Sequence, residues 1–383
     1  MQKLILLFWG TVFLMYLSQV NYPVEAQLHS HHSSRHHFMW KKSDVFMVIV
    51  ILWLTAFSFL RYSYNDTVNY VIMFNNAPTT WEFLAENGWF QLGGNYLSYL
   101  YQSVVHDLTD NIHIYFFFPA LLSSYAVVKF FKRYSVSPAF SLLIFFSLGT
   151  YIMYVAALKQ SIAMFFVLLG IPYLEDRKYG PYYLCVIIAM MFHTHAFMFL
   201  FVPLLCGKPW SKRMWILVGA VCFAMLTYDS TLGAFMRFAD SIGAFVTEIE
   251  VFDGHAINAI RVAVYWFPAI IALVFRRRLF SDSTRTENLL MNLSCMSAFI
   301  LTIGLVEGAN LYARMAGYFE IFTAISLPWM IEKLFTRRSV KLVNGCAYVL
   351  YFVYFYYEFT VSKAFDTDYA AITFWQFIKT LFS

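Results

Sequence analysis

Long apolar runs separated by short polar stretches recur along the whole 383-residue chain. A helix needs about 20 apolar residues to cross the ~30 Å hydrocarbon core of a membrane. The runs lie at about residues 4–20, 44–60, 112–131, 138–156, 160–174, 181–192, 195–206, 214–229, 258–275, 289–306, 311–331 and 342–360. This pattern predicts an all-α, polytopic transmembrane helical bundle of about 11–12 helices, with residues 1–383 forming a single domain.

Lysines and arginines gather between the runs and predict the orientation, because cytoplasmic loops carry an excess of positive charge. The clusters are Lys41/Lys42, Lys129/Lys132/Arg133, Arg177/Lys178, Lys208/Lys212/Arg213, Arg276/Arg277/Arg278 and Lys333/Arg337/Arg338/Lys341. They alternate consistently with the other loops only if the chain passes twice between residues 178 and 208. Both termini then face outward, and loops 61–111 and 230–257 form a small external layer in which residues 95–107 favour an interfacial helix.

The two passes between residues 181 and 206 are unusually short. Each has about a dozen residues, or ~18 Å of α-helix, which cannot span the hydrocarbon core alone. We therefore predict a hairpin with His193-Thr194-His195 at its tip. Broken helices are tolerated at membrane depth where they line a buried cavity, so a histidine pair there, with Lys159 upstream, indicates a functional site. A neutral, hydrogen-bonded bundle histidine is the alternative.

The composition supports a membrane protein. Hydrophobic residues make up 60% of the chain and charged residues only 13%, whereas soluble proteins average about 25% charged. The net charge of +5 therefore reflects orientation and does not indicate nucleic-acid binding. The five cysteines lack metal-ligand spacing, so neither a disulfide framework nor a metal site is expected. The first run also has features of a cleaved signal peptide, although the predicted topology retains it.

Four cations depart from the charge pattern, because each lies at an external helix end. They are Arg61, Lys159, Arg261 and Arg314. The planar guanidinium of arginine matches phosphate oxygens, so this set favours a shared anionic ligand, with contact to lipid headgroups as the alternative. The external acids show no metal-binding spacing and no paired carboxylates, which favours a metal-independent reaction.

Five short motifs follow one another in a fixed order. They are Leu60-Arg61-x4-Asp66-Thr67-x2-Tyr70, Lys159-Gln160-x2-Ala163, Phe192-His193-x2-Ala196, Asn258-Ala259-x-Arg261-x3-Tyr265-x2-Pro268 and Ala313-Arg314-x3-Tyr318-Phe319. In order and spacing they resemble the EpsG/Wzy-like polysaccharide (O-antigen, capsule or exopolysaccharide) polymerases. The chain departs from the family pattern at Lys159, where arginine is usual, at Asn65, where glycine is usual, and at His195, where a small hydroxyl residue is usual.

The resemblance implies glycosyl transfer on the periplasmic face of the bacterial inner membrane, in a fold similar to C-type glycosyltransferases and O-antigen ligases. Its implied substrates are an undecaprenyl-diphosphate-linked oligosaccharide donor and acceptor. Membrane lipid and a chain-length regulator protein are further candidate partners, and no cofactor, metal or nucleic acid is expected.

The resemblance also implies roles for individual residues. His193 is the expected base that activates the acceptor hydroxyl, while Arg61, Arg261 and Arg314 stabilise the diphosphate leaving group. The expected substrate-binding residues are Lys159, Gln160, Asp66, Tyr70, Asn258, Tyr265, Tyr318 and His195. Two residues along a helix point about 200° apart, so His195 is expected to face a different surface from His193.

Three alternatives stay open. A C-type glycosyltransferase with a polyprenyl-phosphate donor would use Asp66 as its base. A membrane O-acyltransferase also keeps a histidine at bilayer depth, but gives no reason for the external cations. A lipid-oligosaccharide flippase should line a cavity with cations through its whole depth, whereas here they gather at one face.

Overall fold

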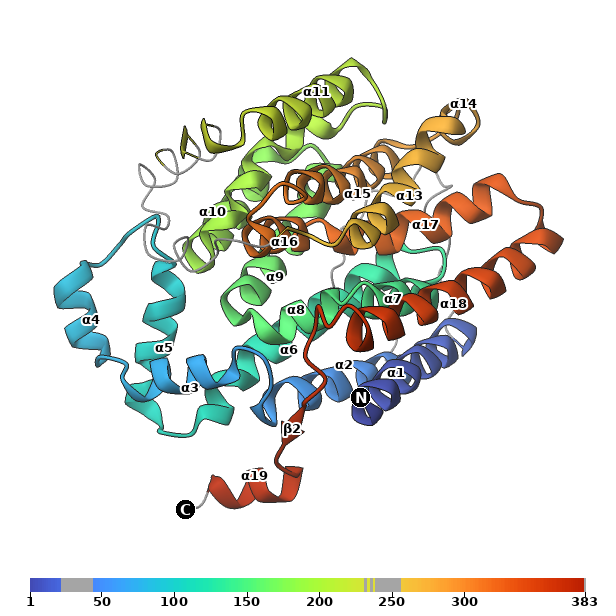
Figure 1. Ribbon diagram of the computed structural model, residues 1–383. Coiled ribbons are helices and arrows are strands. Elements are labelled where there is room, and N and C mark those ends of the chain that lie inside the picture. Colours follow the sequence, from blue (N-terminus) through green and yellow to red (C-terminus); the bar gives the residue numbers. More distant parts are fainter. Residues whose placement is uncertain (22–43, 231–232, 235–236, 238–255, 382–383) are drawn as a thin grey trace.

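The computed structural model describes residues 1–21, 44–230, 233–234, 237 and 256–381. Over this part of the chain it is a bundle of helices with one small two-stranded ribbon, which confirms the all-α prediction (Figure 1). The first predicted cytoplasmic cluster, at residues 41–42, and most of the predicted external loop 230–257 lie outside the described residues.

Every predicted apolar run has a helical counterpart. The elements are α1 (Gln2–Asn21), α2 (Val45–Phe59), α3 (Thr67–Asn75), α4 (Thr80–Asn87), α5 (Tyr96–Leu108), α6 (Ile112–Tyr134), α7 (Pro138–Ser147), α8 (Thr150–Ala156), α9 (Leu158–Glu175), α10 (Tyr179–Phe192), the 3-10 helix η2 (Thr194–Leu205), α11 (Lys212–Leu226), α13 (Ala259–Val274), α14 (Arg276–Leu279), α15 (Arg285–Ile303), α16 (Ala309–Gly317), α17 (Glu320–Leu334), α18 (Arg337–Thr360) and α19 (Phe374–Thr380). Among the described residues, α1, α6, α9 and α15 are each long and apolar enough to cross a membrane, and α7 with α8 makes a fifth span if counted together.

Ion pairs hold together the end of the bundle that carries the basic clusters. Lys132 at the end of α6 pairs with Asp44 at the start of α2, with 3.0 Å between Nζ and Oδ2. Arg133 pairs with Glu175 at the end of α9 over 3.2 Å. Arg61, which follows α2, and Lys159, which opens α9, therefore lie at the opposite end, as the charge pattern predicted.

The chain reverses at His193, as the hairpin prediction required. The Tyr182 hydroxyl of α10 donates to the Phe199 carbonyl of η2 over 2.6 Å. Asn292 of α15 donates to the Leu205 carbonyl at the end of η2, and Arg285 near the start of α15 donates to the Tyr179 hydroxyl at the start of α10. Both arms of the hairpin therefore meet the same stretch of α15.

The second arm is a 3-10 helix, which the sequence did not predict. Its buried residues Ala196, Phe199 and Val202 recur every third position, which is the period of a 3-10 helix. Because this helix rises about 2.0 Å per residue, the arm reaches ~24 Å instead of the ~18 Å expected for an α-helix.

Two runs that were predicted as continuous helices are broken. Residues 138–156 form α7 and α8, which meet at a 66° bend. Gly149 occupies this bend at φ +74°, a conformation that favours glycine. Residues 311–331 form α16 and α17, with Tyr318 and Phe319 between them. Each break carries a polar side chain with a buried partner: Thr150 donates to Glu320, and the Tyr318 hydroxyl contacts His193.

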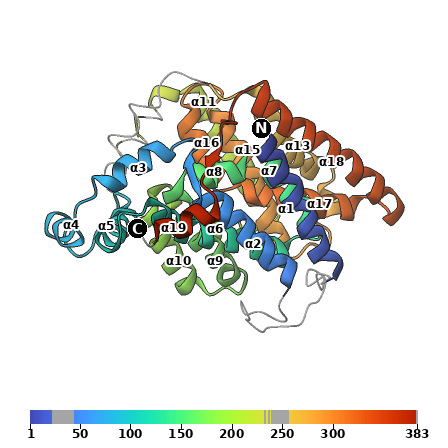
Figure 2. The same ribbon diagram turned by 90° about the horizontal axis from the view of Figure 1, so that it is seen from below.

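The predicted external loop 61–111 is mostly helical, and we call it the outer layer. Its helices α3, α4 and α5 project from the bundle in both views (Figures 1 and 2). The predicted interfacial helix at 95–107 coincides with α5. The buried face of α5 includes the polar residues Ser98, Gln102 and Ser103, so this helix binds the bundle partly through hydrogen bonds.

The last residues, 361–381, form a tail at the same end of the molecule. Strand β1 (Arg61–Ser63) pairs antiparallel with β2 (Ala370–Ala371) of the tail, a ribbon that the sequence did not predict. The ring of Phe377 in α19 packs edge-on against Phe59 at 5.0 Å. The amino group of Met1 donates to the Thr367 carbonyl, so both termini lie at the same end, as predicted.

We expect Gly149→Ala to destabilise the fold. A Cβ atom at Gly149 would lie 2.1 Å from the Phe365 ring of the tail. Overpacking of this kind costs about 1–3 kcal/mol, and the left-handed backbone adds about 1–2 kcal/mol. The measurement is the thermal unfolding midpoint of the purified protein in detergent. In a Phe365→Ala background only the backbone cost should remain, and equal losses in both backgrounds would show that the contact does not form.

Candidate active site

A pocket of about 190 Å³ opens at the end of the bundle that was predicted to face outward, where the outer layer, the tail and three broken or short helices meet. Its walls are Asn65 and Asp66 of the outer layer, Ile152, Met153, Ala156 and Ala157 around the end of α8, Arg261 of α13, Asn310, Ala313 and Arg314 of α16, and Ala364 and Phe365 of the tail. Three of the residues predicted to meet the ligand, Asp66, Arg261 and Arg314, therefore share one pocket.

Arg261 is a buried cation whose hydrogen-bond donors are largely unused. Its Nη2 lies 3.6 Å from Oε1 of Glu320, and its guanidinium lies 5.1 Å from the centre of the Phe365 ring. Neither Nε nor Nη2 has a hydrogen-bond acceptor among the described residues. A buried donor without a partner is unfavourable, so Arg261, which also lines the pocket, has capacity for a further acceptor.

Glu320 fixes the orientation of Arg261. It is fully buried at the first position of α17, where the helix dipole favours a carboxylate. Its Oε2 accepts a hydrogen bond of 2.7 Å from Thr150, the first residue of α8. The breaks at Gly149 and Tyr318 thus bring Thr150 and Glu320 together beneath the pocket. Neither residue belongs to a motif or charge pattern that the sequence makes visible.

Arg314 is the more exposed cation of the pocket. Its Nη2 lies 3.6 Å from Oδ2 of Asp66, and the two side chains are 28% and 39% exposed. Such partly exposed ion pairs contribute little, so an incoming anion can compete with Asp66 for the guanidinium. Gln160 of α9 donates to the backbone carbonyl of Arg314 over 2.9 Å and so anchors α16.

Arg61 has a different environment from the other two arginines. Only 1% of its surface is exposed, and it does not line the pocket. Its Nε donates to the Thr67 hydroxyl over 3.0 Å, while Nη1 donates to the carbonyl and hydroxyl of Ser58. The guanidinium also lies over the Phe116 ring at 4.1 Å. These contacts tie α2, β1 and α3 together, and the predicted diphosphate contact of Arg61 stays a prediction.

The histidine tip, residues 193–195, is buried, and none of its three residues lines the pocket. Nδ1 of His193 lies 2.9 Å from the hydroxyl of Tyr318, which is itself fully buried. If this nitrogen donates to the hydroxyl, the lone pair of Nε2 is left to accept a proton. Of the four predicted cations, Arg314 and Lys159 act electrostatically on His193.

The expectation that His195 faces away from His193 was wrong. The two ring centres lie 4.8 Å apart. The reason is local, because His193 has extended backbone, at φ −152° and ψ 114°, and the chain is not α-helical between the two residues. The 200° separation of an α-helix therefore does not apply to this pair.

The outer layer clamps the histidine tip through two hydrogen bonds that the sequence analysis missed. Ser98 of α5 donates to the Phe192 carbonyl over 2.7 Å, and Oδ1 of Asn95 accepts from the Thr194 backbone N–H over 3.1 Å. Asn95 has φ +56°, a conformation that asparagine tolerates better than most residues. The preceding Gly-Gly-Asn sequence signals this turn, but not its contact across 99 positions.

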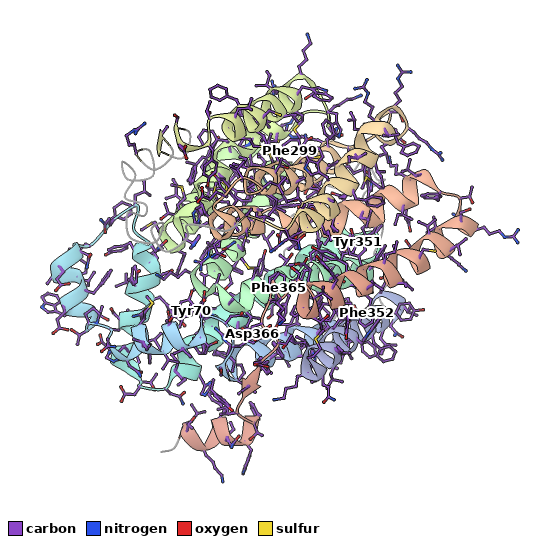
Figure 3. All side chains as sticks on the ribbon, viewed as in Figure 1. Tyr70, Phe299, Tyr351, Phe352, Phe365 and Asp366 are labelled. Carbon is purple, nitrogen blue, oxygen red and sulfur yellow. The ribbon has the colours of Figure 1, made fainter. Side chains whose placement is uncertain are left out.

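Two further predicted binding residues, Lys159 and Tyr70, have partners in the outer layer or at the start of α9. Nζ of Lys159 donates to the Tyr99 hydroxyl over 2.8 Å and lies 4.0 Å from the centre of the same ring. Tyr70 is buried on α3, near Asp66 and the backbone of Lys159. Figure 3 labels Tyr70 on the outer layer and Phe365 on the tail.

Two predicted binding residues flank Arg261 along the chain: Asn258 caps the start of α13, and Tyr265 lies within it. Oδ1 of Asn258 accepts from the Ile260 N–H and caps the helix, while Nδ2 donates to the Tyr357 hydroxyl of α18. Tyr265 is fully buried one turn after Arg261 and interacts with Glu320. The structure thus gives Asn258 a helix-capping role, and its predicted contact with substrate stays a prediction.

Two acids of the outer layer have structural partners. Hydrogen bonds from the Thr79 backbone and hydroxyl hold the pKa of Glu82 below its ordinary value. Hydrogen bonds from Thr80 likewise lower the pKa of Asp107. Both carboxylates are therefore ionised at neutral pH and link the start of α4 to its capping turn and to α5.

The chain also matches a known protein family. The model of the EpsG family matches residues 44–375, which is most of the chain. The chain belongs to the EpsG family. This is the Wzy-like polysaccharide polymerase family, and membership together with the apolar helices indicates a multi-pass membrane protein of polysaccharide biosynthesis. No curated protein and no solved structure matches the chain.

We expect Asn95→Gly to lower polymer synthesis strongly while the protein stays folded. Glycine keeps the left-handed turn but removes the acceptor for the Thr194 N–H, so the histidine tip loses its clamp. The Thr194 N–H is then a buried donor without an acceptor, which destabilises this conformation of the tip by about 1–3 kcal/mol. Asn95→Asp retains an acceptor and should retain most activity. The assay is chain extension in membrane vesicles at equal protein level, and full activity of the glycine variant would exclude this role.

Proposed function

We propose that this EpsG-family protein polymerises undecaprenyl-diphosphate-linked oligosaccharide repeat units on the periplasmic face of the bacterial inner membrane. One observation carries the proposal. Arg261 and Arg314 line the same pocket from different helices, and two nitrogens of Arg261 have no acceptor within the described protein. An external anion with several oxygens fits these unused donors, and a diphosphate has that chemistry.

The proposed reaction is a metal-independent glycosyl transfer. The acceptor hydroxyl oxygen forms a bond to the anomeric carbon of the donor, the bond from that carbon to the diphosphate oxygen breaks, and the hydroxyl proton passes to a base. Negative charge develops on the leaving diphosphate as this bond breaks. Arginines that are already oriented stabilise this charge more in the transition state than in the ground state.

His193 is the proposed base. Its contact with the Tyr318 hydroxyl holds the ring, and the clamp from Asn95 and Ser98 holds the backbone on both sides of it. A positioned imidazole within reach of the acceptor hydroxyl typically contributes 10²- to 10⁴-fold, or about 3–5 kcal/mol. His195 packs against the base and modulates the position of the ring.

The surroundings suit two lipid-linked sugars. The aromatic side chains of Trp81, Trp89 and Phe90 are exposed on the outer layer, where they can stack on sugar rings. The polyprenyl tails lie against the apolar faces of the bundle, and a chain-length regulator is a candidate partner at the outer layer. A C-type glycosyltransferase mechanism with Asp66 as the base is the second candidate, because Asp66 also lines the pocket.

The glycan made by cells tests the function. Cells without the gene should accumulate single repeat units on the lipid carrier or its acceptor, because chain extension stops. His193→Ala should give the same products at a normal protein level, whereas His195→Ser should keep most polymer. Gel analysis of the extracted glycan distinguishes these outcomes. Normal polymer from His193→Ala would remove this residue as the base and leave Asp66 as the next candidate.

Substitutions of the two pocket arginines, Arg314 and Arg261, should both slow chain extension, but by different amounts. Arg314→Ala should slow chain extension by roughly 30- to 1000-fold, since one charge-assisted contact to the leaving group is worth about 2–4 kcal/mol. Arg261→Lys keeps the charge beside Glu320 but loses the planar fork, so we expect a partial loss.

The matched control is Arg237→Ala, an exposed arginine that does not line the pocket. Initial rates with purified protein and defined lipid-linked repeats give the comparison. Equal losses in Arg314→Ala and Arg237→Ala would show that the effect is one of general surface charge.

A further inference from the structure

Two fully buried acids lie beneath the pocket and share one cation. Glu320 of α17 lies 3.6 Å from Arg261, and Glu358 of α18 interacts electrostatically with both Glu320 and Arg261. We call Glu320 and Glu358 the acid pair. Neither carboxylate oxygen of Glu358, nor Oε1 of Glu320, accepts a well-formed hydrogen bond among the described residues, although the Tyr354 hydroxyl interacts with Glu358 and the Tyr265 hydroxyl with Glu320.

Among the described groups around the acid pair, one cation faces two carboxylates. Thr150 of α8 donates one hydrogen bond, to Oε2 of Glu320. The titratable and charged groups that face the pair are Tyr154 of α8, Arg261 and Tyr265 of α13, and Tyr354 of α18. Three of these four are neutral phenols, so Arg261 is the cation of the set.

One guanidinium cannot neutralise two buried carboxylates. A buried ionised carboxylate without donors is strongly unfavourable, and a group in that position binds a proton instead. The acid pair therefore binds a proton most readily when another anion also pairs with Arg261. Arg261 also lines the pocket, so an anion bound there draws on the same charge that stabilises the pair.

We infer that the acid pair is a proton-binding site coupled to anion binding at Arg261. This inference rests on the proposed function, in which the anion is the diphosphate of the substrate. When the diphosphate binds, its oxygen becomes the partner of Arg261, and a proton from water forms an O–H bond on one carboxylate of the pair. No covalent bond of the ligand breaks, and the proton returns to water when the diphosphate leaves.

The coupling predicts a definite sign for the pH dependence of binding. Because the bound state holds more protons than the free state, affinity for the diphosphate falls as pH rises, by up to ~10-fold per pH unit for one coupled proton. Replacing either acid with its amide isostere removes the proton site. Glu320→Gln and Glu358→Gln should therefore bind with a weaker pH dependence than the wild type.

Titration calorimetry on the full chain in detergent tests this inference. The ligand is a short polyprenyl diphosphoryl monosaccharide, whose diphosphate is esterified at both ends and does not titrate near neutral pH. Binding enthalpies are measured in two buffers of different ionisation enthalpy, and their difference gives the number of protons taken up. We expect about one proton for the wild type and for Glu82→Gln, an exposed acid of the outer layer, and much less for Glu358→Gln.

The outcomes separate this inference from the function it rests on. Absence of wild-type binding would overturn both. Wild-type binding without proton uptake would overturn the inference alone, and this comparison needs no variant to fold. Uptake that survives in Glu320→Gln and Glu358→Gln but disappears in His193→Gln would place the proton on the histidine tip and also reject the acid pair.

Discussion

The half of the bundle that lies opposite the basic clusters depends on the buried ion pair between Arg261 and Glu320. A guanidinium and a carboxylate that leave water each lose several kcal/mol of solvation, which their attraction offsets only with good geometry and further hydrogen bonds. Thr150 supplies one such bond, and Phe365 covers the guanidinium from the tail. Helices α8, α13 and α17 and the tail must therefore meet at one point. Two of the helix breaks, before Thr150 and before Glu320, are what allow that meeting.

The sequence was sufficient to predict the helical bundle and the hairpin at His193. Apolar runs of membrane length leave few alternatives to a helix, because lipid offers no partner for a free backbone N–H or carbonyl. Positive charge at alternate loops then restricts the direction of each pass. The hairpin followed from these two constraints together, since a single tilted helix from 181 to 205 would place Lys208 at the wrong end. Contacts of both arms with α15 agree with this argument.

The remaining features depend on contacts between segments that are far apart in sequence. Hydrophobicity does not distinguish the 3-10 arm from an α-helix until the buried face is known, and the β ribbon joins residues about 310 positions apart. Glu320 lies inside a predicted apolar helix, where its position at a helix start is invisible. Asn95 belongs to a loop whose contact with Thr194 arises only when α5 folds onto the hairpin. Patterns along the chain indicate local structure, whereas these residues contact segments that are distant in sequence.

The three arginines have the same residue type and similar places in the sequence pattern. They differ in whether their guanidinium donors have hydrogen-bond acceptors, and this difference identifies the site better than the pattern does. Arg61, Arg261 and Arg314 occupy equivalent places in the pattern, each at an external helix end. Arg61 directs its donors to Ser58 and Thr67, so it stabilises the corner it occupies. Arg261 carries the same charge at similar burial but keeps two nitrogens without acceptors. A buried donor that the protein leaves unsatisfied has an energetic cost, and that cost is offset when a ligand supplies the acceptor. Arg261 is therefore the residue that marks the pocket as a binding site, with Arg314 as the more exposed cation of the same pocket.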